Sequence, residues 1–362
     1  MITRIKISGY KSIKDLDIAL QPVNILLGSN GVGKSNFISI FSLVRNIYNR
    51  NLQNYIQKKG GMDSLLHFGK KNTQEINISI YFKTEADNEN LFNIILEAGQ
   101  NNLFIKSTQT AFKSSGNWHF REYESNNPES MFSQLNFGQA WYVNDRLIEF
   151  DVYHFHDTSD SSPMKGFSDI NDNRRLKRDG SNIASFLYYL QEKEPKHFKR
   201  IELTIKSIAP FFDRFILAPN NLNENMIQLE WQEKGFPDSY FNAYHLSDGT
   251  LRFICLATLL MQPNPPETII IDEPELGLHP VAINKLSALI RKISEDKQVI
   301  LSTQSINLVD NFNPEDIIVT DRDGYNSVFN RLSGEDLNIW LNDYTLGDLW
   351  GQNKFGAQPY GV

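Results

Sequence analysis

The chain has 362 residues, of which 40% are hydrophobic, 12% aromatic and 22% charged. These fractions are those of an ordinary globular protein, and they exclude wholesale disorder, collagen-like repeats and disulfide scaffolds. With 36 basic and 43 acidic residues the formal net charge is −7, which does not favour non-specific nucleic-acid binding over the whole surface. The length predicts two structural units, or one large α/β unit with an insertion.

The single cysteine and the apolar runs indicate the compartment. Cys255 has no second thiol for an intramolecular disulfide or a multi-thiolate metal site. The longest apolar run, 251–261, contains Arg252 and is far shorter than the ~20 residues of a membrane span. The N-terminal residues alternate charged and apolar side chains, unlike a signal peptide. We therefore expect a cytoplasmic protein with no membrane contact.

The N-terminal third reads as strands around a glycine-rich turn. Apolar alternation predicts strands within 2–8 and 13–27, and residues 23–27 form a nearly continuous apolar run, typical of a strand buried on both faces. After the turn, residues 35–48 have helical periodicity. Residues 76–82 alternate as in a strand with one wet face. The order strand, glycine loop, helix indicates nucleotide binding.

The rest of the chain has a less regular first half. Residues 84–150 are rich in Asn, Ser and Gln, with aromatic islands at 118–120 and 141–143, and we expect hairpins of an antiparallel arm. A polar loop is expected over 158–182. The further predicted elements are helices within 183–190, 198–208, 246–261 and 282–293, strands at 268–271 and 298–301, and a closing hairpin at 317–319 and 328–329.

Residues 28–35, Gly-Ser-Asn-Gly-Val-Gly-Lys-Ser, match the Walker A pattern GxxxxGK[ST]. Glycines let backbone N–H groups surround phosphate oxygens, and the following helix N-terminus adds a favourable dipole. Lys34 would neutralise the β- and γ-phosphates of ATP, and the Ser35 hydroxyl would bind Mg²⁺. A chance glycine turn is the alternative, which the flanking strand and helix disfavour. The predicted nucleotide-binding residues here are Gly28, Ser29, Asn30, Gly31, Val32, Gly33, Lys34, Ser35 and Asn36.

Two further motifs lie in the last third. The run Thr268–Glu275 places Asp272 and Glu273 at the end of a buried strand. Asp272 suits the Mg²⁺ shell and Glu273 is poised to polarise an attacking water; a solvated acidic pair is the alternative. Residues 246–252, Leu-Ser-Asp-Gly-Thr-Leu-Arg, form a Ser-Asp-Gly turn that by itself is a common helix cap.

These motifs, with Ser302-Thr303-Gln304-Ser305, occur in the order seen in ABC-type ATPase heads. More closely, the chain resembles the bacterial RecF/SMC-like AAA-family ATPases, a group that includes the overcoming-lysogenization-defect (OLD) ATPases. Tyr10-Lys11-Ser12 is similar to the opening element of that group. The resemblance implies an α/β, ABC-ATPase-like P-loop head with a mixed sheet, an inserted antiparallel arm and a helical subdomain. The division would be an N-terminal ATPase lobe 1–83, an insertion 84–240 and a C-terminal lobe 241–362.

The resemblance also implies roles. Two heads sandwich two ATP molecules, so Ser247, Asp248 and Gly249 would cap a nucleotide held by the other copy. Asp272 would serve Mg²⁺ and Glu273 would be the general base. The implied roles of the remaining residues are a D-loop at 275–279, a nucleotide-phosphate contact for Lys11, and the catalytic switch position for Gln304.

The chain departs from the family pattern at the switch position and at the Q-loop. The switch position is often His, and Gln304 cannot carry a proton charge, so we expect slow or conformation-gated hydrolysis of ATP to ADP and phosphate. Gln304 also allows a further alternative function, an ATP-binding scaffold with negligible turnover. The Q-loop glutamine has three candidates, Gln53, Gln57 and Gln74.

We expect an ATP-sandwiched homodimer that switches a partner effector, expected to be a nuclease, in anti-phage defence or DNA repair. The alternative is a module that binds DNA ends or DNA structures and is released by hydrolysis. Neither sustained heptads nor an acidic Toprim constellation after Asp272 is present in the sequence, which indicates a stand-alone head. Assembly beyond a dimer stays open.

For two polar clusters, ligand binding has to be weighed against an ordinary structural or solvated role. His154, His156 and Asp157 invite a metal interpretation because alternate residues of a strand share a face, yet a structural or interprotomer role is favoured. The basic segment 174–178 is a solvated loop by default, with a nucleic-acid or phosphate contact as its alternative.

Overall fold

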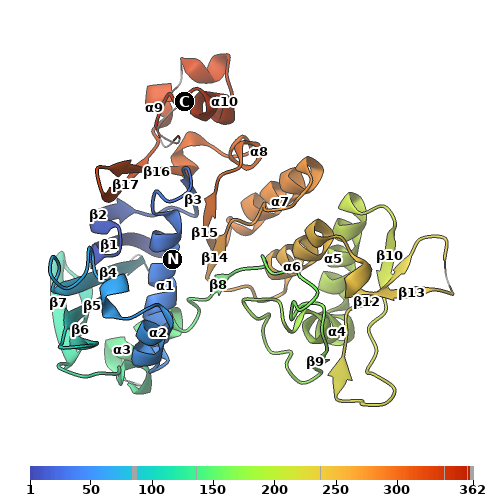
Figure 1. Cartoon of the computed structure of the whole chain (residues 1–362), viewed down its shortest axis with the longest axis horizontal. Coiled ribbons are helices and arrows are strands. Elements are labelled where there is room, and N and C mark those ends of the chain that lie inside the picture. Colours follow the sequence, from blue (N-terminus) through green and yellow to red (C-terminus); the bar gives the residue numbers. More distant parts are fainter. Residues whose placement is uncertain (84–87, 136, 237, 338, 357, 359–362) are drawn as a thin grey trace. The chain divides into compact units, whose positions relative to one another are not determined.

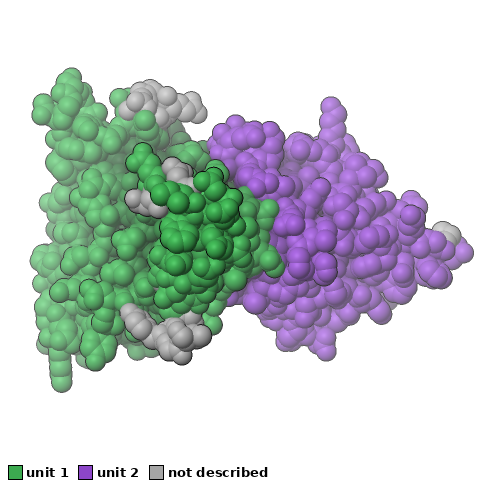
Figure 2. All heavy atoms as spheres, turned by 90° about the horizontal axis from the view of Figure 1, so that it is seen from above, with its two compact units in different colours: residues 1–152, 267–270, 297–362 green, residues 153–266, 271–296 purple. Residues whose placement is uncertain are grey.

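The computed structural model describes residues 1–83, 88–135, 137–236, 238–337, 339–356 and 358. They form two compact units, which Figure 2 colours separately. Unit 1 comprises residues 1–152, 267–270 and 297–362, and unit 2 comprises 153–266 and 271–296. The long predicted insertion 84–240 is therefore divided: its first part belongs to unit 1, and unit 2 begins at Tyr153.

One sheet of unit 1 is antiparallel throughout (Figure 1). Its strand order is β2 (Ile13–Ala19), β1 (Ile2–Tyr10), β4 (Glu75–Lys83), β5 (Glu89–Ala98), β6 (Leu103–Ser114) and β7 (Asn117–Glu124). The hairpins expected after residue 84 are thus present, but they extend the N-terminal sheet. The reason is shared burial: Ile80 of β4 pairs with Phe92 of β5, and both are buried in one core.

The second sheet carries the nucleotide motif. Its order is β17 (Asn326–Arg331), β16 (Ile317–Asp323), β3 (Val23–Leu27), β15 (Gln298–Thr303), β14 (Thr268–Asp272) and β8 (Val152–Tyr153). β3 runs parallel to β15 and β16, and β16 and β17 are antiparallel. Every residue of β3 is buried, as its apolar run predicts. The sheet is therefore mixed, as expected.

Helix α1 (Lys34–Tyr48) begins directly after the glycine turn (Figure 1). Phe37, Phe41 and Val44 of α1 share one buried core with Ile5 of β1 and Ile300 of β15. The helix is therefore held between residues of both sheets, which fixes the turn at its N-terminus. The other helices of unit 1 are α2 (Leu52–Lys58), α3 (Gly138–Leu147), α8 (Ile306–Val309), α9 (Gly334–Leu337) and α10 (Leu346–Gly351).

The hairpin expected around residues 141–143 is wrong, because these residues lie in α3. The buried side chains Ala140, Val143, Asn144 and Leu147 have helical spacing. Trp141, which suggested a strand, is 61% exposed.

Unit 2 consists of helices with short strands. The helices are α4 (Ile183–Lys193), α5 (Pro195–Ile208), α6 (Asp248–Met261) and α7 (Pro280–Ile293); the strands are β9 (Ser168–Asp169), β10 (Phe212–Phe215), β11 (Met226–Ile227), β12 (Glu230–Glu233) and β13 (Tyr240–Asn242). Helix α6 is apolar on most sides and packs against α5 and α7. Cys255 lies buried within α6, and burial raises the pKa of its thiol.

The loop before α4 is tied down by one side chain. Asn182 is fully buried; its Oδ1 accepts the N–H of Lys177, and its Nδ2 donates to the carbonyls of Asp172 and Arg175.

In the described ranges, no helix is both long enough and apolar enough to cross a membrane.

Gln298 joins the two sheets of unit 1. Its side chain is fully buried at the start of β15, accepts the N–H of Ile2 at 2.9 Å, and donates to the carbonyls of Ile2 and Gln21 at 2.8 and 2.9 Å. The amide therefore satisfies backbone groups at the first residue of β1 and before β3.

We expect Gln298→Leu to lower the free energy of unfolding by about 3 kcal/mol, because a buried polar group left without a partner costs roughly 1–3 kcal/mol. Denaturant unfolding measures this difference. Gln57→Leu, at an exposed position of α2, is the control and should stay within about 0.5 kcal/mol of wild type. Equal stability of the two variants would contradict the role of Gln298.

Candidate active site

The predicted P-loop has the backbone that a phosphate cradle requires. Gly31 and Gly33 have φ values of 79° and 120°, in the left-handed region that favours glycine. A Cβ at Gly33 would lie 2.0 Å from Ser327 Oγ, so position 33 has no room for a side chain. The glycine pattern is therefore a steric requirement of this loop.

The loop is supported from β17 and from the turn after β1. Ser327 Oγ lies 2.5 Å from the Val32 carbonyl and 2.6 Å from Ser12 Oγ. Asn36 Nδ2 donates to the same Ser12 hydroxyl at 2.7 Å. Ser12 and Ser327 thus brace the loop, and the side-chain amide of Asn36 points to this brace.

The loop's polar groups fit a Mg²⁺–triphosphate. Lys34 is only 4% exposed, and its Nζ donates to the carbonyls of Gly28 and Ser29 at 2.6 and 2.9 Å. Ser35, the next residue, is exposed. Backbone N–H groups, a lysine ammonium and a serine hydroxyl together are the donor set of a phosphate-binding loop. The Ser35 hydroxyl would be a ligand for Mg²⁺, which when bound would supply positive charge against the negative phosphates.

A pocket of about 570 Å³ is formed at the P-loop. Gln304, which follows β15, lines this pocket with P-loop residues, so the structure brings these two predicted elements together. The lining residues are Ser29, Asn30, Gly31, Val32, Gln304, Asp321, Arg322, Trp350 and Gln358. Arg322, which sequence reasoning did not select, also donates from Nε to the Gly31 carbonyl at 3.1 Å.

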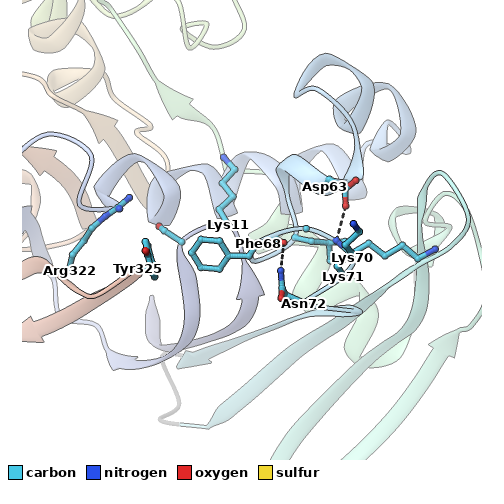
Figure 3. Close-up of a pocket in the computed structure, with 11 residues that line it drawn as sticks. Lys11, Asp63, Phe68, Lys70, Lys71, Asn72, Arg322 and Tyr325 are labelled. Carbon is cyan, nitrogen blue, oxygen red and sulfur yellow. Dashed lines mark hydrogen bonds between the residues drawn. The ribbon is translucent and has the colours of Figure 1, made fainter.

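A second pocket of unit 1, of about 540 Å³, shares Arg322 with the first. Figure 3 shows its aromatic and basic side chains. Phe68 and Tyr325 are 52% and 76% exposed, and their rings meet edge to face with centroids 5.9 Å apart. The lining residues are Lys11, Ser12, Asp63, Leu66, Phe68, Gly69, Lys70, Lys71, Asn72, Arg322 and Tyr325.

Sequence reasoning missed this second pocket, except for Lys11. Phe68 and Tyr325 are far apart in the chain and belong to no motif. Their proximity depends on the pairing of β16 with β3 and of β16 with β17. The φ of +53° at Phe68 is likewise invisible in the sequence.

Lys11 lies in a strained turn beside the P-loop. Its φ is +48°, its backbone N–H donates to the Leu65 carbonyl, and its own carbonyl accepts a hydrogen bond from His67 Nδ1. The ammonium donates to Ser39 Oγ of α1 at 3.0 Å. Burial, with a smaller contribution from the charge of Lys59, lowers the pKa of Lys11 to about 8.

The other predicted residues belong to unit 2. Asp272 ends β14, and Glu273 follows with φ of +42°. Ser247 and Asp248 are exposed, and Ser247 Oγ accepts the N–H of Thr250 as the N-cap of α6. A Cβ at Gly249 would lie 2.5 Å from the Gly277 carbonyl. The turn formed by Ser247, Asp248 and Gly249, the capping turn, therefore packs closely against the predicted D-loop.

The two histidines flank Asp272. His156 Nε2 donates to the Asp272 carbonyl at 2.8 Å, and His154 Nδ1 lies 3.9 Å from the Asp272 carboxylate. Within the described part of the chain, no group of three or more His, Cys, Asp or Glu side chains is arranged to hold a metal ion. Both histidines therefore lie beside the acidic turn, which is formed by Asp272 and Glu273.

Two of the three Q-loop candidates donate to backbone carbonyls, and the third is exposed. Gln53 donates to the carbonyls of Leu103 and Pro128, and Gln74 donates to that of Lys70. Gln57 is exposed on α2. None of the three lines either pocket described above.

Comparison with known proteins identifies the family. Residues 23–310 match the family described as "AAA domain, putative AbiEii toxin, Type IV TA system". The chain belongs to this AAA-domain family. The predicted resemblance to ABC/SMC-like AAA ATPases is thereby confirmed. A 62-residue segment is 37% identical to ABC transporter A family member 11 of Dictyostelium discoideum, and covers 17% of this chain and 7% of that protein.

Solved structures confirm the predicted fold class. An Smc head bound to the C-terminal winged-helix domain of ScpA has a TM-score of 0.61 at 17% identity, covering 93% of this chain and 99% of that one. An Smc head with an extended coiled coil, bound to the C-terminal domain of ScpA from Pyrococcus furiosus, has a TM-score of 0.59 at 15% identity, with 94% and 98% covered. This AAA-family chain therefore has the α/β fold of SMC heads.

Nucleotide binding should weaken with pH through Lys11. Only the protonated ammonium attracts phosphate, so the affinity for an ATP analogue should fall about tenfold between pH 7 and 9, across the pKa of about 8. Lys11→Gln should bind more weakly at pH 7 and lose most of this dependence. Titration of a fluorescent analogue in both proteins measures the difference; parallel pH profiles would contradict a phosphate contact by Lys11.

Proposed function

We propose that this protein is an ATP-binding and ATP-hydrolysing switch, in which two copies sandwich two ATP molecules. The observation that carries the proposal is the braced P-loop, whose pocket also contains Gln304. Lys34 and Ser35 would supply the ammonium and the hydroxyl that a Mg²⁺–triphosphate requires. The family membership supports an ATPase over other nucleotide-binding functions.

The pocket with Phe68 suits the nucleoside part of ATP. It adjoins the P-loop through Ser12 and Arg322, and it combines an exposed aromatic face with basic side chains. A purine can stack on such a face. Lys11 and Arg322 would then lie toward the negatively charged phosphates.

The capping turn, Ser247, Asp248 and Gly249, suits contact with a nucleotide that a second copy holds. Ser247 and Asp248 are exposed at the N-terminus of the 14-residue helix α6, where N–H groups and the helix dipole favour an anion. In a second copy these groups would meet the γ-phosphate. Glu273 would accept a proton from the attacking water, Asp272 would serve Mg²⁺, and Gln304 would hydrogen-bond the γ-phosphate or the water.

The output of the switch is proposed to be a separate effector, of nuclease type, in anti-phage defence or DNA repair. Heads of the same fold have been solved with a bound domain of another protein, ScpA, which supports a protein partner for this chain. The net charge of −7 favours a protein effector over DNA as the main partner.

The Glu273→Gln variant should accumulate as an ATP-bound dimer with phosphate release reduced at least 100-fold, because the base is lost and the phosphate cradle is kept. Mass in solution with and without Mg-ATP, together with phosphate release, measures this. Ser247→Arg is the matched variant. It should bind ATP normally and stay monomeric, since the added side chain fills the capping turn. Unchanged turnover of Glu273→Gln, or an ATP-dependent dimer of Ser247→Arg, would contradict the switch.

The Phe68→Ala variant should bind ATP about 5- to 150-fold more weakly, because base–aromatic stacking contributes roughly 1–3 kcal/mol. Its affinity for inorganic triphosphate should not change, since that ligand has no base. Phe120→Ala is the control, because Phe120 is a 62% exposed aromatic on β7 that lines neither pocket. Equal ATP affinity of the two variants would exclude Phe68 from the base site.

A further inference from the structure

Glu273 has a backbone conformation that needs support. Its φ of +42° lies in the left-handed region that residues with side chains rarely adopt. Such a conformation is strained and persists only where neighbouring contacts impose it. The side chain proposed as the general base therefore depends on something that holds this turn.

His156 supplies a contact that can hold this turn. Its Nε2–H donates to the Asp272 carbonyl at 2.8 Å. That carbonyl belongs to the peptide group joining Asp272 to Glu273, and the φ of Glu273 is the rotation about the bond that follows this peptide. Fixing the carbonyl fixes the plane from which the Glu273 side chain projects.

The segment that carries His156 is itself anchored by Arg252 of α6. The Arg252 guanidinium donates to the carbonyls of Phe155 at 3.1 Å and His156 at 2.7 Å. It also donates to the Leu276 carbonyl, just beyond Glu273, at 2.7 Å. The segment of His156 and the acidic turn are thus tied to one guanidinium group, whose planar fork of donors suits several carbonyls at once.

We propose that His156 is a positioning residue that sets the direction of Glu273 through the Asp272 carbonyl. The proposal rests on the proposed role of Glu273 as general base. His156 contacts the backbone of the acidic turn, so its effect on the reaction passes through that turn.

The same contacts would couple the two copies of the ATP sandwich. Arg252 lies on the same helix as the capping residue Ser247. A nucleotide bound against Ser247 from a second copy would restrain α6, and Arg252 would pass this restraint to the His156 segment and to Leu276. Glu273 would then be best oriented when the sandwich has formed.

The test compares His156→Phe with His156→Gln in the full chain. The Phe variant removes the donor and should slow single-turnover ATP hydrolysis by 10- to 100-fold, because a small misplacement of a catalytic group has effects of this size. The affinity for a non-hydrolysable ATP analogue should not change. The Gln variant keeps an N–H donor at a similar reach and should recover most of the rate.

A second readout needs no nucleotide. The N–H groups of Leu276 and Leu278 donate to the carbonyls of Glu273 and Glu275 within the turn. Hydrogen exchange at these amides should be faster in His156→Phe than in wild type, and close to wild type in His156→Gln. If His156→Phe does not fold, His156→Asn replaces it, since its donor is too short to reach the Asp272 carbonyl.

The outcomes separate the two proposals. If Glu273→Gln hydrolyses ATP at the wild-type rate, the general-base role fails whatever His156 does. If Glu273→Gln is inactive while His156→Phe has wild-type turnover and exchange, positioning by His156 is overturned. Equal slowing by Phe and Gln with unchanged exchange would overturn it as well, because ring packing rather than the hydrogen bond would then matter.

Discussion

The P-loop keeps its shape because Ser327 occupies the space that a side chain at position 33 would need. The same hydroxyl contacts the Val32 carbonyl and Ser12, so the loop is fixed from a strand nearly 300 residues away. A phosphate-binding loop has to keep its N–H groups convergent before the ligand arrives, since ordering a loose loop would reduce affinity. The two pockets described beside the P-loop depend on this brace, because Arg322 and Tyr325 reach them from the same hairpin.

In unit 2 a comparable constraint acts on the acidic turn. Glu273 has a left-handed backbone, and the carbonyl before it accepts a hydrogen bond from His156. Arg252 donates to the Leu276 carbonyl just beyond this turn and to carbonyls of the segment that carries His156. Strain of this kind is found where a side chain must point in one direction for chemistry. The capping turn of α6 packs against Gly277 of the predicted D-loop. The N-terminal turn of α6 and the acidic turn therefore belong to one packed cluster.

Similarity to Smc heads extends over almost the whole chain at 17% and 15% identity. A likeness at this identity reflects the fold, in which a buried strand, a glycine turn and a helix recur whatever the attached regions do. Function has to be argued from the site residues. In this chain the features that suit a nucleotide are a glycine-lined loop, a buried lysine beside it and an exposed helix N-terminus in unit 2.

Local patterns in the sequence determined the P-loop, the acidic strand end and the capping turn, because each depends on neighbouring residues. The all-buried β3 and the helices α1, α4, α5, α6 and α7 were predictable for the same reason: their apolar spacing is local. Only the tertiary structure decided that β5–β7 extend the N-terminal sheet, that residues 141–143 are helical, and that Phe68 meets Tyr325. It also decided that His156 holds the Asp272 carbonyl. Each of these depends on which distant side chains share a core or a backbone partner, and spacing along one chain does not specify that.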